Sequence, residues 1–236
     1  MKKVQNKSDF TEIVFVLDRS GSMVDVVSDT IGGFNSMIKR QKEEVSNAFV
    51  TTVLFDDKIN IIHDRIKINE VPLLTNKEYY ARGCTALLDA IGCTIKHIRN
   101  IHKYARKSDI PAKTLFIITT DGYENSSHEY SMTKVKSMIE EQKTKNNWDF
   151  LFLGANIDAI ESANKIGIDR EYAANVINDK EGVDVLYQTV SDAVYRCSKS
   201  CCLSKNWKEK IDNDFKRRNK SNKNTGDKAI PSFLRK

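Results

Sequence analysis

The chain has 236 residues, a length that suits one α/β domain with an appendage or two small domains. Hydrophobic residues make up 40% and charged residues 30%, a composition that excludes general disorder, because a chain of this size can bury about 70–75% of its unfolded surface. The 10 glycines and 3 prolines exclude a collagen-like or proline-rich chain. The formal net charge of +6 is concentrated in residues 205–236, which carry eleven Lys or Arg against four Asp or Glu.

No segment has the length and apolarity of a membrane span. The apolar runs Ile13 to Leu17 and Leu115 to Ile118 are far shorter than the ~20 residues that a membrane helix needs. Lys2 and Lys3 resemble the start of a signal peptide, but the apolar run that follows ends at Asp18 without a cleavage site of small residues. Five cysteines, an odd number, argue against a disulfide framework. We therefore expect a cytoplasmic protein with reduced thiols and no membrane partner.

Short apolar runs alternate with amphipathic helical stretches along the first 200 residues. Strands buried on both faces are predicted for Glu12 to Leu17, Ala48 to Phe55, Lys113 to Thr119, Trp148 to Leu153 and, more briefly, Ala173 to Ile177. Helices are predicted from apolar stripes that start near Val27, Leu87 and Val135, from a short segment after Asp158, and from Gly182 to Ser200.

This alternation predicts a doubly wound α/β fold, an open and mostly parallel sheet with helices on both faces. One connection is too short for a helix. Phe55 to Lys58 joins Ala48–Phe55 to a run at Ile59 to Ile62, so these two strands must form an antiparallel hairpin at the sheet edge.

Three regions follow from the composition. Residues 1–8 form an N-terminal extension, residues 9–202 the globular domain, and residues 203–236 a basic tail. In the tail, Trp207, Phe215 and Phe233 stand singly among charges, so we expect it to be disordered. Nucleic-acid binding by charge and stacking is the alternative role for this tail.

Polar side chains follow the predicted strands at the points where ligands bind in open α/β sheets. They are Asp18, Ser20 and Ser22 after the first strand, Thr85 ahead of the helix near Leu87, and Asp121 after the strand that starts at Lys113. Three hydroxyls and two carboxylates suit a hard cation such as Mg²⁺, with Mn²⁺ as a substitute. An ion held mainly by neutral hydroxyls and water is short of negative charge, and it can therefore bind the carboxylate of a partner.

At these residues the sequence resembles the von Willebrand factor A (VWA) domain and its metal-ion-dependent adhesion site (MIDAS). The MIDAS pattern is Asp-x-Ser-x-Ser, a later Thr and a later Asp, and all of its positions are present. The resemblance covers about residues 9 to 200 and is greatest to stand-alone bacterial members of the family. It implies a Rossmann-like VWA fold, Ser20, Ser22 and Thr85 as hydroxyl ligands, and Asp18 and Asp121 acting largely through water.

Plainer interpretations stand beside the metal site. Asp18 to Ser22 is also typical of a turn with a helix cap, Thr85 of an N-cap, and Asp121 of an ordinary strand-end turn. For Arg19 we favour a solvated charge. The residues at 123–125 (Tyr123, Glu124, Asn125) are either a rim that contacts the partner or a polar loop without a role. For the cysteines at the end of the last predicted helix (Cys197, Cys201, Cys202), core packing is favoured over metal binding.

The favoured function is a non-enzymatic module that captures an Asp or Glu of an unidentified protein partner through the metal ion. The resemblance also implies a regulatory or scaffolding role. The alternatives are a metal-dependent phosphoester hydrolase and an RNA-binding protein that acts through the basic tail. Against the hydrolase, the chain has no Walker phosphate-binding motif and no second cluster of carboxylates.

Overall fold

The computed structural model describes residues 10–45, 47–200, 203–204 and 206–224. The strands are β1 (Thr11–Asp18), β2 (Ala48–Phe55), β3 (Ile59–Lys67), β4 (Lys113–Thr120), β5 (Trp148–Ala155) and β6 (Ala173–Val176). The α-helices are α1 (Val27–Glu44), α2 (Leu87–Tyr104), α3 (Met132–Asn146), α4 (Ala159–Lys165), α5 (Lys180–Ser200) and α6 (Glu209–Asn224). Short 3₁₀ turns are η1 (Gly21–Val26), η2 (Ile68–Glu70), η3 (Lys107–Asp109) and η4 (Arg170–Tyr172).

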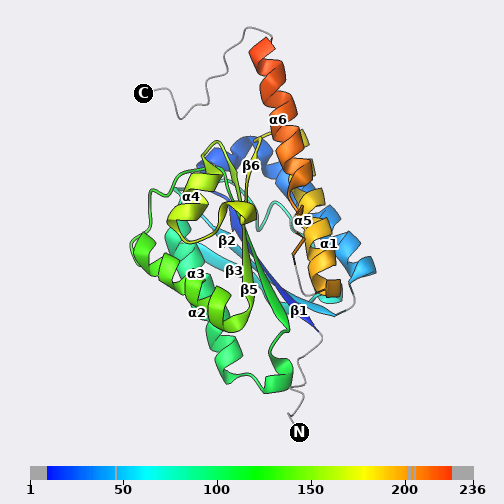
Figure 1. The fold of residues 1–236 in the computed structure, drawn as a ribbon, viewed down its shortest axis with the longest axis vertical. Helices are drawn as coiled ribbons and strands as arrows, with labels where there is room; N and C mark the ends of the chain where they lie inside the picture. The colour runs from blue at the N-terminus through cyan, green and yellow to red at the C-terminus, as the bar shows by residue number, and fades with distance from the viewer. Residues whose placement is uncertain (1–9, 46, 201–202, 205, 225–236) are drawn as a thin grey trace.

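The strands form one sheet in the order β3-β2-β1-β4-β5-β6 (Figure 1). All neighbouring strands are parallel except the edge pair β2 and β3, which is antiparallel. The predicted fold class and edge hairpin are therefore confirmed, although β3 extends to Lys67, beyond the predicted end at Ile62. The strand order reverses between β1 and β4, so the carboxyl ends of these two strands flank the crevice where such sheets bind ligands.

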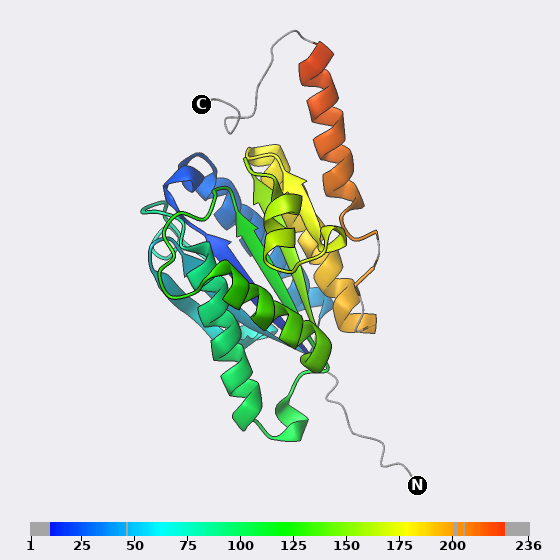
Figure 2. The ribbon, with the colours of Figure 1, turned by 60° about the vertical axis from the view of Figure 1, so that its left-hand side comes forward.

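The central strand β1 is buried along its whole length, and its alternation divides the core into two layers. Ile13, Phe15 and Leu17 pack in one layer, under α1 and α5. Val14 and Val16 pack in the other layer, under α2, α3 and α4. Figure 2 shows α2 and α3 lying across the sheet on the side opposite to α1. The two layers hold β1 and β4 rigidly, so the loops at their carboxyl ends start from fixed points.

The prediction of a disordered tail is wrong for residues 206–224, which contain helix α6. Trp207 and Ile211 are 6% and 2% exposed and belong to the same core layer as α5, and Phe215 is half-buried. The Trp207 indole also donates a hydrogen bond of 2.9 Å to the carbonyl of Glu171. These three apolar residues recur every four positions, so they form a helical stripe and are not isolated residues. Figure 1 shows α6 extending beyond the first turn of α5, away from the sheet.

Several predictions fall partly or wholly outside the described residues. The N-terminal extension at 1–8, the end of the tail at 225–236, and Cys201 and Cys202 lie outside them. Cys197 is fully buried in the core, which confirms the packing interpretation for this cysteine. In the described part of the chain, no helix is long and apolar enough to cross a bilayer.

Replacing Trp207 with Ala tests whether α6 is part of the folded domain. We expect a loss of about 3–5 kcal/mol in the free energy of unfolding, because the substitution leaves a large cavity and removes a hydrogen bond. Urea denaturation followed by circular dichroism measures the loss. Lys220→Ala, at an exposed position on the same helix, should change the stability by less than about 0.5 kcal/mol. A Trp207→Ala variant as stable as the wild type would show that α6 does not dock.

Candidate metal centre

Asp18 ends β1 and lies fully buried at the floor of the site. One carboxylate oxygen accepts the backbone N–H of Ser20 at 2.7 Å, and the other accepts the hydroxyl of Thr120, the last residue of β4, at 2.6 Å. Its carbonyl accepts the phenol of Tyr79 at 2.6 Å. The Asp18 carboxylate therefore links the ends of the two strands that flank the crevice. Its hydrogen bond with the Ser20 N–H also holds the loop after β1 in a tight turn.

Four of the predicted ligands converge above Asp18. The Oγ atoms of Ser20 and Ser22 are 3.2 Å apart, and Ser22 Oγ donates to Oδ1 of Asp121 at 2.5 Å. Thr85 lies close to the same group. A Cβ added to Gly122 would lie 3.0 Å from Thr85 Oγ1 and 3.7 Å from Ser22 Oγ, so both hydroxyls lie beside this glycine. The structure thus brings all five predicted residues to one point at the edge of the sheet.

Two of the predicted caps are absent. Ser20 precedes η1, but its side chain makes no capping hydrogen bond. Helix α2 begins at Leu87 with Ala86 at the N-cap position, so Thr85 does not cap it. The hydroxyls of Ser20 and Thr85 are therefore not explained by helix capping, which was the main alternative to ligation.

A buried ion pair holds these loops together. Arg19, which was expected to be solvated, is only 2% exposed, and its Nε donates to the carboxylate of Asp56 at 2.8 Å. The same carboxylate oxygen accepts Nε of Arg82 at 2.7 Å. Arg19 also donates to the carbonyl of Glu78 at 3.0 Å. Arg19 is thus a structural residue, and the prediction of a solvated side chain is wrong.

The loop after Asp121 supports Thr85 from the other side. The side chain of Asn125 accepts the N–H of Thr85 at 2.9 Å, and the N–H of Asn125 donates to the Thr85 carbonyl at 3.1 Å. The Glu124 carboxylate accepts the N–H of Leu88 in the first turn of α2 at 2.8 Å. Glu124 and Asn125 therefore position the site. Tyr123, which is 50% exposed, and Asn125, which is also exposed, are accessible to a partner.

Burial raises the pKa of both carboxylates in the site. It raises the pKa of Asp18 to about 6, against the opposing hydrogen bonds from Thr120 and Ser20. The pKa of Asp121 is also raised by burial, although hydrogen bonds from Ser22 and Asn178 act in the opposite direction. Within the described chain, neither carboxylate forms an ion pair with Lys or Arg, so a cation here would meet uncompensated negative charge.

The donor set fits a hard divalent cation. It offers hydroxyl and carboxylate oxygens alone, the atoms that Mg²⁺ and Mn²⁺ prefer. Among the residues that the structure describes, no three His, Cys, Asp or Glu side chains gather in a metal-binding group, and this site contains only two carboxylates. Any ion held here would therefore depend on the hydroxyls and on water for most of its coordination.

Comparisons with known proteins identify the fold. No family model matches the chain, and no curated protein matches it. Among solved structures, a von Willebrand factor type A protein from Catenulispora acidiphila aligns with a TM-score of 0.56 at 16% identity, over 80% of this chain and 43% of that one. The chain has the von Willebrand factor A fold.

Two further structures share this VWA fold. The PilB minor pilin from Streptococcus sanguinis aligns with a TM-score of 0.57 at 12% identity, over 82% of this chain and 63% of that one. Proximal thread matrix protein 1 from the mussel byssus, with a zinc-occupied MIDAS motif, aligns with a TM-score of 0.54 at 16% identity, over 81% and 47%. This chain spans less than two thirds of each of the three matched chains.

Replacing Asp56 with Ala tests the buried ion pair. The change leaves the Arg19 charge buried without its carboxylate partner, and we expect a loss of about 3–5 kcal/mol in the free energy of unfolding at pH 7. Asp57→Ala removes an exposed neighbouring carboxylate and serves as the control. Equal stability of the Asp56→Ala variant and the wild type, measured by urea denaturation, would contradict the assignment.

The same variant has a defined pH dependence. Burial alone would raise the pKa of Asp56, but the hydrogen bonds from Arg82 and Lys58 and the charge of Arg19 lower it below its ordinary value. A lowered pKa in the folded state stabilises the fold above the unfolded pKa, and this stabilisation is lost as the pH falls through the folded pKa. The deficit of Asp56→Ala should therefore be full at neutral pH and shrink below about pH 4.

Proposed function

We propose that this protein is a metal-dependent protein-binding module. In this proposal, Ser20, Ser22 and Thr85 hold a divalent cation through their hydroxyls, and Asp18 and Asp121 act through coordinated water. The observation that carries the proposal is the convergence of these five side chains at the point where the strand order reverses. The ion supplies a positive centre for an anionic ligand.

The partner chemistry follows from the charge of the site. Two carboxylates that act mainly through water leave a divalent ion with net positive charge toward solvent, so an Asp or Glu side chain of a partner is the ligand of choice. Ser22 is exposed, which gives such a carboxylate access to the site. A regulatory or scaffolding role in the cytoplasm of a bacterium is part of the same proposal.

Catalysis is not part of the proposal. The Asp18 carboxylate is engaged by Ser20 and Thr120, and the Asp121 carboxylate by Ser22 and Asn178. Neither is therefore free to act as a general base beside the ion. The fold by itself does not decide this point, because one fold hosts many functions.

The RNA-binding alternative is weaker than the sequence indicated. Two of the basic residues of the predicted tail, Arg217 and Arg218, are engaged in ion pairs with Glu181 and Asp214. Lys208 is likewise engaged, because its ammonium donates to backbone carbonyls at Arg170 and at Ala173, the first residue of β6. Residues that are tied to the domain contribute less to a charged surface for phosphates.

Loss of a hydroxyl ligand should weaken metal binding without unfolding the domain. We expect Ser22→Ala and Thr85→Ala to raise the Kd for Mn²⁺ by at least about tenfold in isothermal titration calorimetry. Thr144→Ala removes an exposed hydroxyl on α3 and should leave the Kd unchanged. Unaltered affinity in both site variants would place the ion elsewhere.

Partner capture should depend on the ion and on an acid. We expect proteins retained by the immobilised chain in Mg²⁺ to be lost in EDTA, and a retained partner to lose binding when its critical Asp or Glu is changed to Ala. Capture that is equal in Mg²⁺ and EDTA would contradict the proposal. Metal-dependent hydrolysis of a phosphoester that survives purification and disappears in Asp121→Ala would favour the hydrolase instead.

A further inference from the structure

The Asp121 carboxylate accepts a second hydrogen bond, from a residue much later in the sequence. Its Oδ1 accepts the hydroxyl of Ser22, and its Oδ2 accepts Nδ2 of Asn178 at 3.0 Å. Asn178 lies in the short segment between β6 and α5. With one donor on each oxygen, the carboxylate is fixed in rotation. A cavity of about 30 Å³ lies beside Asp121 and Asn178, so the loss of the amide would leave space there.

The segment that carries Asn178 is a tight turn into α5. The next residue, Asp179, accepts the N–H of Gly182 on its side chain and the N–H of Val183 on its carbonyl, both at 2.9 Å. A Cβ at Gly182 would lie 2.0 Å from the carbonyl oxygen of Ile177, so the turn closes tightly at this glycine. These contacts fix the backbone of the turn, so a shift of Asp179 would also move Asn178.

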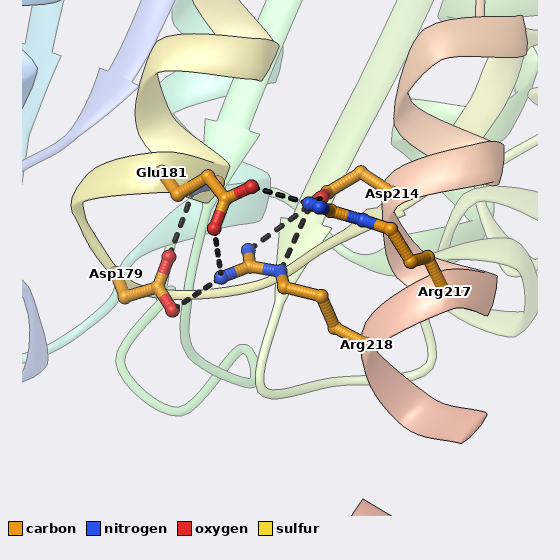
Figure 3. Close-up of polar contacts among 6 residues, drawn as sticks. Asp179, Glu181, Asp214, Arg217 and Arg218 are labelled. Atoms are coloured by element: carbon orange, nitrogen blue, oxygen red, sulfur yellow. Dashed lines mark hydrogen bonds and ion pairs between the residues drawn. The ribbon is translucent and has the colours of Figure 1, made fainter. Parts of the chain in front are cut away.

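Helix α6 holds this turn through Arg218 (Figure 3). Arg218 donates to the second carboxylate oxygen of Asp179 at 2.6 Å and pairs with Asp214 at 3.0 Å and with Glu181 at 3.5 Å. The neighbouring Arg217 pairs with Glu181 and Asp214. The Arg218 side chain is 19% exposed and that of Arg217 is 63% exposed, so solvent screens the pairs of Arg217 more strongly.

We propose that Asn178 is a positioning residue for Asp121 of the metal site, and that Arg218 of α6 sets the place of Asn178 by holding Asp179. This inference rests on the proposed function of the site. Groups that orient a metal ligand contribute to affinity although they never touch the ion. A residue of the segment that was predicted to be a disordered tail thereby supports the metal centre.

Calorimetric titration of the full chain with Mn²⁺ alone tests the inference in five proteins: the wild type, Asn178→Ala, Arg218→Ala, the double variant and Arg217→Ala. We expect the Kd to rise about tenfold in Asn178→Ala and about threefold in Arg218→Ala. If Arg218 acts through Asn178, the double variant should bind no more weakly than Asn178→Ala. Arg217→Ala, the matched control, should bind as the wild type does.

The outcomes separate the inference from the proposed function. A wild type that does not bind Mn²⁺ overturns the proposed function and the inference with it. A wild type that binds, with Asn178→Ala and Arg218→Ala equal to it, overturns the inference alone. Equal weakening in Arg217→Ala and Arg218→Ala, or additive effects in the double variant, would overturn the route through Asp179.

Folding of the variants is checked separately. The melting temperature of each metal-free variant shows whether a change in Kd comes from global unfolding. Arg218→Lys and Asn178→Ser replace any variant that does not fold. The Arg218→Lys variant keeps a positive charge that can reach Asp179, and we expect it to bind Mn²⁺ more tightly than Arg218→Ala does.

Discussion

The buried carboxylate of Asp56 joins the two loops that carry the predicted hydroxyl ligands. Its oxygen Oδ2 accepts Arg19 from the first loop and Arg82 from the loop that leads to Thr85. The backbone carbonyl of Asp56 accepts the N–H of Ala86 at 2.9 Å. Two loops without regular structure are thereby tied to the end of β2, and Thr85 is held close to the first loop. Removal of one partner from such a buried pair leaves an uncompensated charge, so separation of the loops is strongly unfavourable.

Paired charges and the two site carboxylates have different roles in this arrangement. Charged groups that are paired, such as Arg19 with Asp56, serve to hold the loops. Among the described residues, the carboxylates of Asp18 and Asp121 accept hydrogen bonds from hydroxyl and amide donors only, and burial raises the pKa of both. In the part of the chain that the structure describes, two carboxylates that are not paired with Lys or Arg therefore lie together at the site. Further support comes from Asn178, in the segment between β6 and α5, and from the ion pairs of Arg218 on α6.

Most of the fold was predictable because it depends on local pattern. The apolar runs predicted the strands, and the short connection after Phe55 predicted the antiparallel edge. The five polar side chains were found because parallel strands end at the same sheet edge. The burial of Arg19 was not predictable, since it depends on Asp56, which is distant in sequence. The wrong prediction of disorder at α6 had a different cause. The helical spacing of Trp207 and Ile211 was visible in the sequence, but these residues were treated as isolated.

Diffraction from crystals soaked in Mn²⁺, with anomalous differences collected near the manganese edge, tests the central claim most directly. We expect one strong peak among the hydroxyls of Ser20, Ser22 and Thr85. A map without a peak at these hydroxyls, or with the strongest peak at another carboxylate group such as Asp179 and Glu181, would contradict the account.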